Sequence, residues 1–215
     1  MGPERVFAEQ SVQVKPCVGF LSSRLPIIGP ESITEARSLK GVPGFKGEGH
    51  HEIMEAKYGG KKVFIKISSR VEGEPIREIR KMMRMNEAGA GAKVLATYED
   101  PRFPGIPGVV FDFIPGVIYR GGIGIYRLPE NFPLNEGLAD QIEDVGRKIE
   151  AAGFHSAVNV QFIFSLDGKT ATFVDAEGVF DSPPALGTHR EHPTTITRRM
   201  GEEIRAFLRA KAAKI

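Results

Sequence analysis

Cysteine is almost absent from this sequence of 215 residues, in which Cys17 stands alone. A single cysteine excludes an intramolecular disulfide and a cysteine-rich zinc site. Long apolar runs are absent too, so no transmembrane segment is expected. The N-terminal stretch MGPERVFAEQSVQVKP is polar and lacks the apolar core of a secretory signal peptide. We therefore expect a cytoplasmic protein, or one that is exported without a conventional signal peptide.

Excess charge of either sign is also small, because 29 basic and 27 acidic residues leave a formal net charge of +2. Such a small excess gives no reason to expect a nucleic-acid partner. The apolar fraction of 41% and the charged fraction of 26% are those of an ordinary globular protein. A chain of this length can bury a sizeable core as one or two domains.

Two β-prone runs lie between residues 48 and 68 and surround the pair Gly59-Gly60. A Gly-Gly pair between two such runs predicts a β-hairpin. Because side chains alternate along a strand, Lys66 is expected on the same face of the second strand as Phe64.

Helix and strand patterns follow one another along the rest of the chain. Residues 74–86 and 134–153 carry apolar residues at helical spacing, and 108–116 is typical of a buried strand that Pro-Gly ends. An Asp-Gly pair predicts a second hairpin across 160–175, and 194–215 is an amphipathic third helix. The pattern predicts an α+β fold with a β-rich half and a helix-rich half.

These patterns divide the chain into three parts. Residues 1–40, which prolines interrupt, are expected to form an irregular arm or a few short elements. Residues 41–115 are expected to form a small β-rich lobe, and residues 116–215 a reduced helical lobe of the same domain.

Four sequence features follow one another along the chain and together indicate one site. Lys66 stands late in a strand, in VFIK, after the glycine-containing segment GFKGEG. Glu78 lies on the next helix, VVFDFIPG leads into a connector, and Asp175 follows the second hairpin in VDAEG. Each motif is weak alone, and their order and spacing carry the resemblance over roughly residues 44–180. The chain thus resembles a two-lobed, protein kinase-like phosphotransferase.

The resemblance implies roles in binding ATP and Mg²⁺. Lys66 would contact the α- and β-phosphates, and Glu78 would hold that lysine through an ion pair. Asp175 would bind Mg²⁺, with Gln161, which precedes the apolar run FIF, preferred to Asn159 as a further ligand. Backbone groups would supply the other nucleotide contacts, at Gly44, Gly47 and Gly49 for phosphate and at Asp112, Phe113 and Ile114 for adenine.

An alanine stands where the family has its catalytic base. The family's His-x-Asp triplet corresponds to His155-Ser156-Ala157, and alanine can neither accept a proton nor orient a hydroxyl. We favour the explanation that this chain is an inactivated version of a kinase with Asp at residue 157, because the surrounding motifs are intact. A natural pseudokinase is the second explanation. A register shift that puts Ser156 at the base position is the third, although serine is no better as a base.

The short C-terminal part resembles the minimal kinases that pathogenic bacteria deliver into host cells. That resemblance implies a bacterial effector or toxin with a role in virulence, acting in a host cytosol on Ser, Thr or Tyr of a host protein. Two alternatives stay open. One is a pseudokinase scaffold that binds nucleotide or a partner without catalysis, and the other is a small-molecule kinase, which the short C-terminal part disfavours.

Each candidate residue also has an ordinary structural interpretation. Lys66 could be a surface lysine of an edge strand, which is the commoner position of lysine. Glu78 could be a solvated residue of its helix, and Asp175 could cap a turn. The glycine-rich stretch 119–126 looks like a phosphate-binding loop, but it precedes no clear strand–helix unit, and we expect a flexible connector there.

Overall fold

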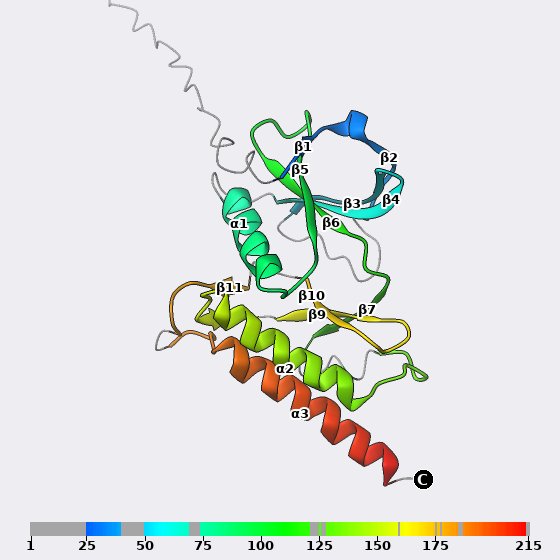
Figure 1. Ribbon diagram of the computed structural model, residues 1–215, viewed down its shortest axis with the longest axis vertical. Helices are drawn as coiled ribbons and strands as arrows, with labels where there is room; N and C mark the ends of the chain where they lie inside the picture. Colours follow the sequence, from blue (N-terminus) through cyan, green and yellow to red (C-terminus); the bar gives the residue numbers. More distant parts are fainter. Residues whose placement is uncertain are drawn as a thin grey trace, which may run out of the picture.

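The computed structural model describes residues 25–39, 50–68, 74–120, 125, 128–158, 160–174, 176, 178–184 and 187–213 (Figure 1). Within these residues the chain forms a six-stranded sheet with one helix beside it, and a helix-rich part that contains a three-stranded sheet. The arrangement confirms the predicted α+β class.

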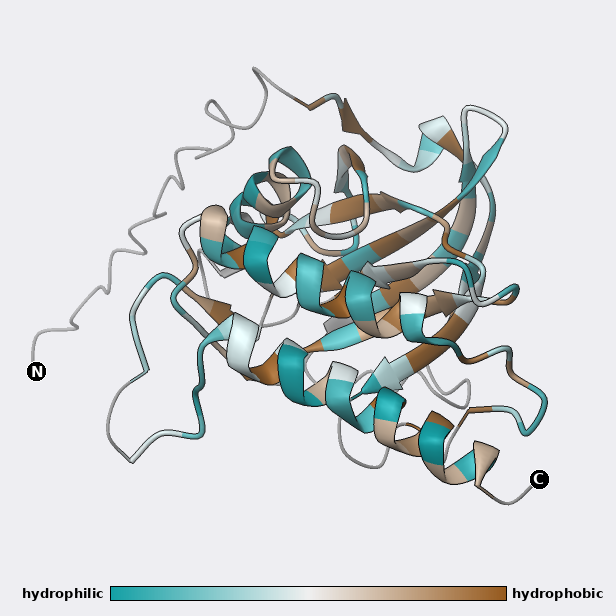
Figure 2. Ribbon diagram, turned by 60° about the horizontal axis from the view of Figure 1, so that its bottom comes forward, coloured by the Kyte–Doolittle hydropathy of each residue, from teal (hydrophilic) through white to brown (hydrophobic). Residues whose placement is uncertain are grey.

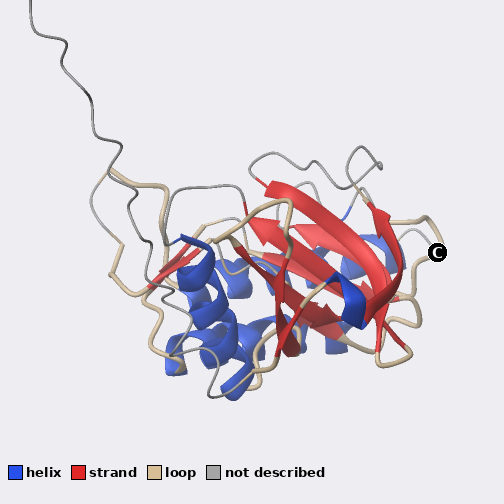
Figure 3. Cartoon of the chain, turned by 90° about the horizontal axis from the view of Figure 1, so that it is seen from above, coloured by secondary structure: helices blue, strands red, loops and turns tan. Residues whose placement is uncertain are grey.

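The six-stranded sheet has the order β1-β5-β6-β4-β3-β2, and its strands curl strongly (Figure 3). Its neighbouring pairs are antiparallel, apart from the parallel pair of β1 and β5. The strands are β1 (Ile27–Ile28), β2 (Ile33–Ser38), β3 (His50–Tyr58), β4 (Lys61–Ser68), β5 (Val94–Glu99) and β6 (Pro107–Asp112). β3 and β4 form the predicted hairpin, with Gly59 and Gly60 at φ 55° and 76°. A type I′ turn needs this left-handed conformation at both positions.

Residues 25–39, for which we expected an irregular arm or a few short elements, form short elements that belong to this sheet. β1 pairs with β5 and β2 pairs with β3, and the short 3-10 helix η2 (Pro30–Ser32) joins β1 to β2. Strands this short have little pattern of their own, and pairing with distant strands creates them. Residues 1–24 of the predicted arm lie outside the described residues.

The two faces of the sheet pack against different apolar clusters. Val63, Ile65 and Ile67 of β4 are wholly buried in one cluster. Phe64, on the opposite face, packs against a larger cluster that includes apolar side chains of helix α1 (Glu74–Glu87) and of the helix-rich part. Alternation along β4 puts Lys66 on the Phe64 face, as predicted, and therefore toward α1.

The helix-rich part contains a sheet of order β10-β9-β7. β9 (Gln161–Ser165) and β10 (Ala171–Phe173) form the second predicted hairpin. Strand β7 (Gly116–Arg120) pairs with β9, although we expected a flexible connector from residue 119 onward. Two shorter strands, β8 (Ser156–Ala157) and β11 (Val179–Phe180), pair with each other.

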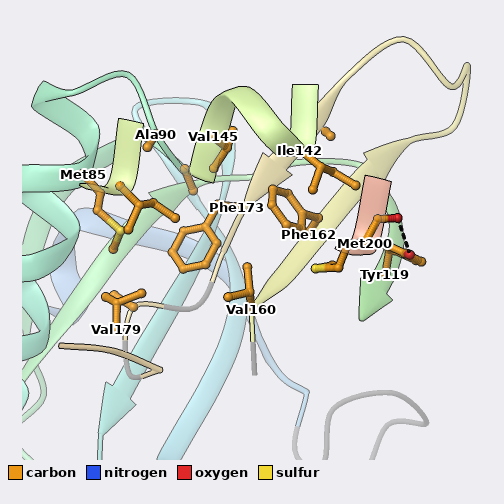
Figure 4. Close-up of a cluster of buried hydrophobic side chains, with 14 of the residues drawn as sticks. Met85, Ala90, Tyr119, Ile142, Val145, Val160, Phe162, Phe173, Val179 and Met200 are labelled. Carbon is orange, nitrogen blue, oxygen red and sulfur yellow. Dashed lines mark hydrogen bonds between the residues drawn. The ribbon is translucent and has the colours of Figure 1, made fainter. Parts of the chain in front are cut away.

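Helices α2 (Glu136–Ala151) and α3 (Pro193–Ala212) lie side by side below this sheet (Figure 1), with many hydrophilic residues on their outer surfaces (Figure 2). Both helices were predicted. Their apolar side chains meet those of β9, β10 and α1 in the larger cluster, where Ile142, Phe162, Phe173 and Met200 lie close together (Figure 4). None of the helices in the described part of the chain combines the length and the apolar character needed to span a bilayer.

Candidate functional site

Lys66 and Glu78 form an ion pair that joins the sheet to helix α1. The Nζ atom of Lys66 lies 2.6 Å from Oε1 of Glu78, and the two side chains are 16% and 8% exposed. Lys66 extends from β4, and the helical turn that buries Ile79 in the core also presents Glu78 to the strand. The structure thus brings together the first two residues of the predicted site. Breaking such a largely buried pair by removing one partner is costly, because the other charge stays behind without compensation.

Lys81, one turn further along α1, is a buried cation that sequence reasoning missed. The residue is 7% exposed, and its Nζ contacts the carbonyl oxygens of Val179 and, at 3.5 Å, of Ala176. The ammonium also lies 4.9 Å from the centre of the Phe180 ring. Residues three apart share one face of a helix, so Lys81 lies on the same side of α1 as Glu78.

The connector after β6 offers fewer free backbone groups than we expected. The N–H of Asp112 donates to the carbonyl of Lys93 at 3.0 Å, and the N–H of Phe113 donates to the carbonyl of Lys62 at 3.3 Å. Only the N–H of Ile114, among these three, makes no hydrogen bond to another described residue. A ligand could therefore receive a backbone hydrogen bond from Ile114, whereas the other two N–H groups maintain the sheet.

Phe113 has a fixed place beside strand β4. The centre of the Phe113 ring lies 4.9 Å from the centre of the Phe64 ring. Nζ of Lys62 lies 4.3 Å from the centre of the Phe113 ring. These contacts hold the connector against the sheet face that also carries Lys66. The backbone of Ile114 and the ammonium of Lys66 consequently belong to one rigid arrangement.

Ala157 is wholly buried, which bears on its expected place at the base position. Its N–H donates to the Glu191 carbonyl at 2.7 Å, and its own carbonyl accepts from the Glu191 N–H at 3.1 Å. Residue 157 pairs with Val179 in the β8–β11 ladder. An aspartate carboxylate here would lose its hydration among apolar side chains. This burial gives no support to the explanation that the chain once carried a working base at residue 157.

Ser156, the alternative under a register shift, does not supply a base either. Ser156 is wholly buried, and its hydroxyl donates to the Ser182 carbonyl at 2.6 Å. The side chain of His155 is exposed, and its backbone N–H donates to the Phe180 carbonyl at 2.9 Å. A register shift by one residue therefore puts a serine with a structural hydrogen bond at the base position.

The structure describes one of the three expected metal ligands. Gln161 begins β9 and is half-buried, and its carbonyl accepts from the N–H of Val174, the residue before Asp175. Asp175 and Asn159 lie outside the described residues, as do Gly44, Gly47 and Gly49. Within the described part of the chain, no three acidic, histidine or cysteine side chains cluster as metal ligands would.

The described residues fit the nucleotide part of the expected ligand. A lysine held by a carboxylate provides a fixed positive charge for phosphate, and Ile114 provides an N–H for the edge of a base. The metal part depends on Asp175, which the sequence places next to Val174 and Ala176. Those two flanking residues are described, and Ala176 lies within reach of Lys81 on the same helix as Glu78.

Comparison with known proteins adds no relative from which a function could be carried over. No family model matches the chain, and the search of curated proteins finds no match. The resemblance to the kinase-like family therefore stays a prediction that rests on the residues described above.

Proposed function

We propose that this protein is an ATP- and Mg²⁺-binding phosphotransferase of a two-lobed, protein kinase-like fold with a reduced helical lobe, and that its substrate is a protein. The observation that carries the proposal is the largely buried pair of Lys66 and Glu78, which spans a strand and the helix that follows it. Lysine is rarely buried to this extent, and the pair fixes the position of an ammonium on the strand that precedes α1.

The order of the elements supports the proposal. Lys66 lies on the third strand of the antiparallel run β2-β3-β4, and Glu78 lies on the next helix. In protein kinases the phosphate-binding lysine lies on the third strand and pairs with a glutamate of the following helix. β6 then leads through a short connector into the helix-rich part, where α2, the pair β8–β11 and the hairpin β9–β10 follow.

Three groups of the chain would share the work of holding ATP. The ammonium of Lys66 would bind phosphate oxygens, and Glu78 would orient that ammonium and keep it from adopting other rotamers. The N–H of Ile114 would donate to the base. When bound, Mg²⁺ would offset the negative charge of the phosphates, and Asp175 is the residue expected to hold it.

A nucleotide-binding pseudokinase is the second candidate, and the burial of Ala157 favours it. Neither Ala157 nor Ser156 offers a group that could accept a proton from a substrate hydroxyl. Both candidates share the nucleotide site and differ in whether the γ-phosphate is transferred.

The nucleotide site can be tested by calorimetric titration with ATP and Mg²⁺. We expect saturable binding to the wild-type protein and a loss of at least tenfold in affinity for Lys66→Met, because phosphate loses its fixed cation. Lys61→Met is the matched control, since Lys61 is an exposed lysine of the same strand and should be dispensable. Absence of ATP binding by the wild-type protein, or equal binding by both variants, would rule the proposal out.

Phosphate transfer separates the two candidates once binding is established. Wild-type protein is incubated with γ-labelled ATP and a lysate, and Lys66→Met serves as the negative control. Label on a protein that depends on Lys66 identifies a phosphotransferase. Tight binding without transfer or ATP hydrolysis, by the wild-type protein and by Ala157→Asp alike, identifies a pseudokinase.

A further inference from the structure

Helix α1 carries a stripe of charged side chains of which the proposed function uses only one. Glu78, Lys81 and Arg84 are spaced by three residues and so share one side of the helix. Glu78 contacts Lys66 of β4, whereas Lys81 contacts the carbonyls of Ala176 and Val179. Arg84 contacts Asp181 of that same segment and also the Ala152 carbonyl. One helix thus connects the phosphate-binding strand with the segment that follows Asp175.

Lys81 is the most deeply placed cation of this stripe. An ammonium group loses much of its hydration when it is buried, so its position must be stabilised by hydrogen-bond acceptors. The carbonyls of Ala176 and Val179 supply such acceptors, and the face of the Phe180 ring lies next to the ammonium. The ion pair of Arg84 with Asp181 is a weaker connection, because its two side chains are 40% and 53% exposed.

The segment that Lys81 contacts is also held from its other side. The Phe180 carbonyl accepts from the N–H of His155, and the Gly178 carbonyl accepts from the N–H of Val158. The guanidinium of Arg190 lies 3.7 Å from the centre of the Phe180 ring. The same ring thus contacts two cations, Arg190 and Lys81. These contacts fix the segment to the helix-rich part, and Lys81 fixes it to α1.

We propose that Lys81 is a positioning residue, which couples the pair of Lys66 and Glu78 to the segment that flanks Asp175. This inference rests on the proposed function and deepens it by naming what sets the geometry of that site. Contacts within the chain, from Lys81 to two backbone carbonyls, hold the flank of the expected metal-binding acid at a fixed place relative to the phosphate-binding lysine.

Hydrogen exchange tests the coupling without any need for activity. In Lys81→Met we expect exchange in a peptide covering 178–182 to rise on the order of tenfold, because a hydrogen-bonded anchor is lost. Arg77→Met is the matched control, since Arg77 is an exposed cation of the same helix, and it should leave this exchange unchanged. Lys81→Arg, which keeps the charge and the donors, should restore most of the protection. Unchanged exchange in Lys81→Met would overturn the inference.

The dependence of nucleotide affinity on Mg²⁺ distinguishes positioning from a purely structural role. In Lys81→Met we expect ATP affinity without Mg²⁺ to stay within about twofold of wild type, and the gain on adding Mg²⁺ to fall at least fivefold. Equal weakening with and without Mg²⁺ would show a structural role only and would overturn the inference. If Lys81→Met does not fold, Lys81→Gln replaces it in both measurements.

Failure of the proposed function gives a different result from failure of this inference. If wild-type protein binds no ATP, the proposed function fails, and the exchange measurement still decides whether Lys81 anchors the segment. If wild-type protein binds ATP with a gain from Mg²⁺ that Lys81→Met keeps in full, the proposed function stands and the inference fails.

Discussion

At the scale of single residues, the burial of Lys66 and Glu78 bears on whether their two charges serve function or folding stability. Two charges that are 16% and 8% exposed have lost most of their hydration, and their attraction offsets that loss only while both are present. Apolar residues of similar size could replace the pair without a large loss of stability. The presence of both charges at such a place is therefore better explained by a ligand than by folding.

We predict that Lys66→Met and Glu78→Leu are each less stable than the double variant Lys66→Met/Glu78→Leu. Each single change leaves a charge of the pair without its partner, at a cost of roughly 1–3 kcal/mol, whereas the double change leaves none. Urea unfolding measures the stabilities, and titration with ATP measures binding. ATP affinity should be lost in all three variants. A double variant that is no more stable than either single variant would contradict this prediction.

We also predict that Ala157→Asp destabilises the protein by roughly 2–4 kcal/mol at pH 7, because the new carboxylate would be buried. Burial raises the folded-state pKa of such a carboxyl above its unfolded value of about 3.9, so protonation relieves the penalty. The stability deficit should accordingly shrink as the pH falls toward 4, in urea unfolding at several pH values.

Ala36→Asp is the matched control, since Ala36 is exposed on edge strand β2. It should show little loss of stability and little dependence on pH. If Ala157→Asp is as stable as wild type and transfers phosphate, the explanation of an inactivated kinase is right, and the structural argument against it is wrong.

The single-residue predictions from sequence depended on how local the signal was. The resemblance to the kinase-like family implied that Lys66 and Glu78 would pair, and alternation along β4 predicted only the face on which Lys66 lies. Lys81 was missed because most lysines on helices are solvated, and only tertiary packing shows which one is buried. The same is true of Ala157, whose burial comes from the pairing of β8 with β11.

At the scale of elements, the close packing of α2 and α3 depends on a residue without a side chain. A Cβ atom on Gly146 of α2 would lie 1.9 Å from Oγ1 of Thr197 on α3. That hydroxyl donates to the Pro193 carbonyl at 2.9 Å, and the wholly buried threonine has no room to move. The two helices can approach each other this closely only because residue 146 is glycine.

We predict that Gly146→Ala lowers the free energy of unfolding by about 1–3 kcal/mol, because overpacking outweighs the better helix propensity of alanine. Thermal and urea unfolding measure the change. Adding Thr197→Ala should restore part of the loss by removing the clashing hydroxyl. Glu202→Ala, at an exposed residue of α3, is the control and should be close to neutral. A stabilising effect of Gly146→Ala would contradict the packing described here.

The predicted elements were right where the sequence pattern was long. Helices α1, α2 and α3 and both hairpins were expected because their apolar spacing or glycine-containing turns are local features. β7 was missed because its partner, β9, is far away in the sequence and a proline and a glycine stand at its start. For β1 and β2 the sequence predicted no more than an irregular arm or a few short elements, because pairing across the sheet creates short strands that have no pattern of their own.

At the scale of the whole molecule, one apolar cluster runs from the sheet face that carries Phe64 through α1 into the helix-rich part. The ion pair of Lys66 with Glu78 joins β4 to α1, and the contact of Lys81 with the Ala176 carbonyl joins α1 to the helix-rich part. Composition and charge gave no hint of this arrangement, because a net charge of +2 says nothing of where charges are buried. The account therefore depends on one place, where an ammonium on β4 is expected to meet the phosphates of ATP.

Chemical labelling of lysines by an acyl-phosphate derivative of ATP tests that claim most directly. The probe transfers its acyl group to an amine that lies at the phosphates, ATP departs, and mass spectrometry identifies the acylated lysine. We predict that Lys66 is labelled and that excess ATP prevents its labelling, while labelling of Lys61 is unaffected by ATP. Labelling of Lys66 that ATP does not reduce, or ATP-sensitive labelling confined to other lysines, would contradict the account.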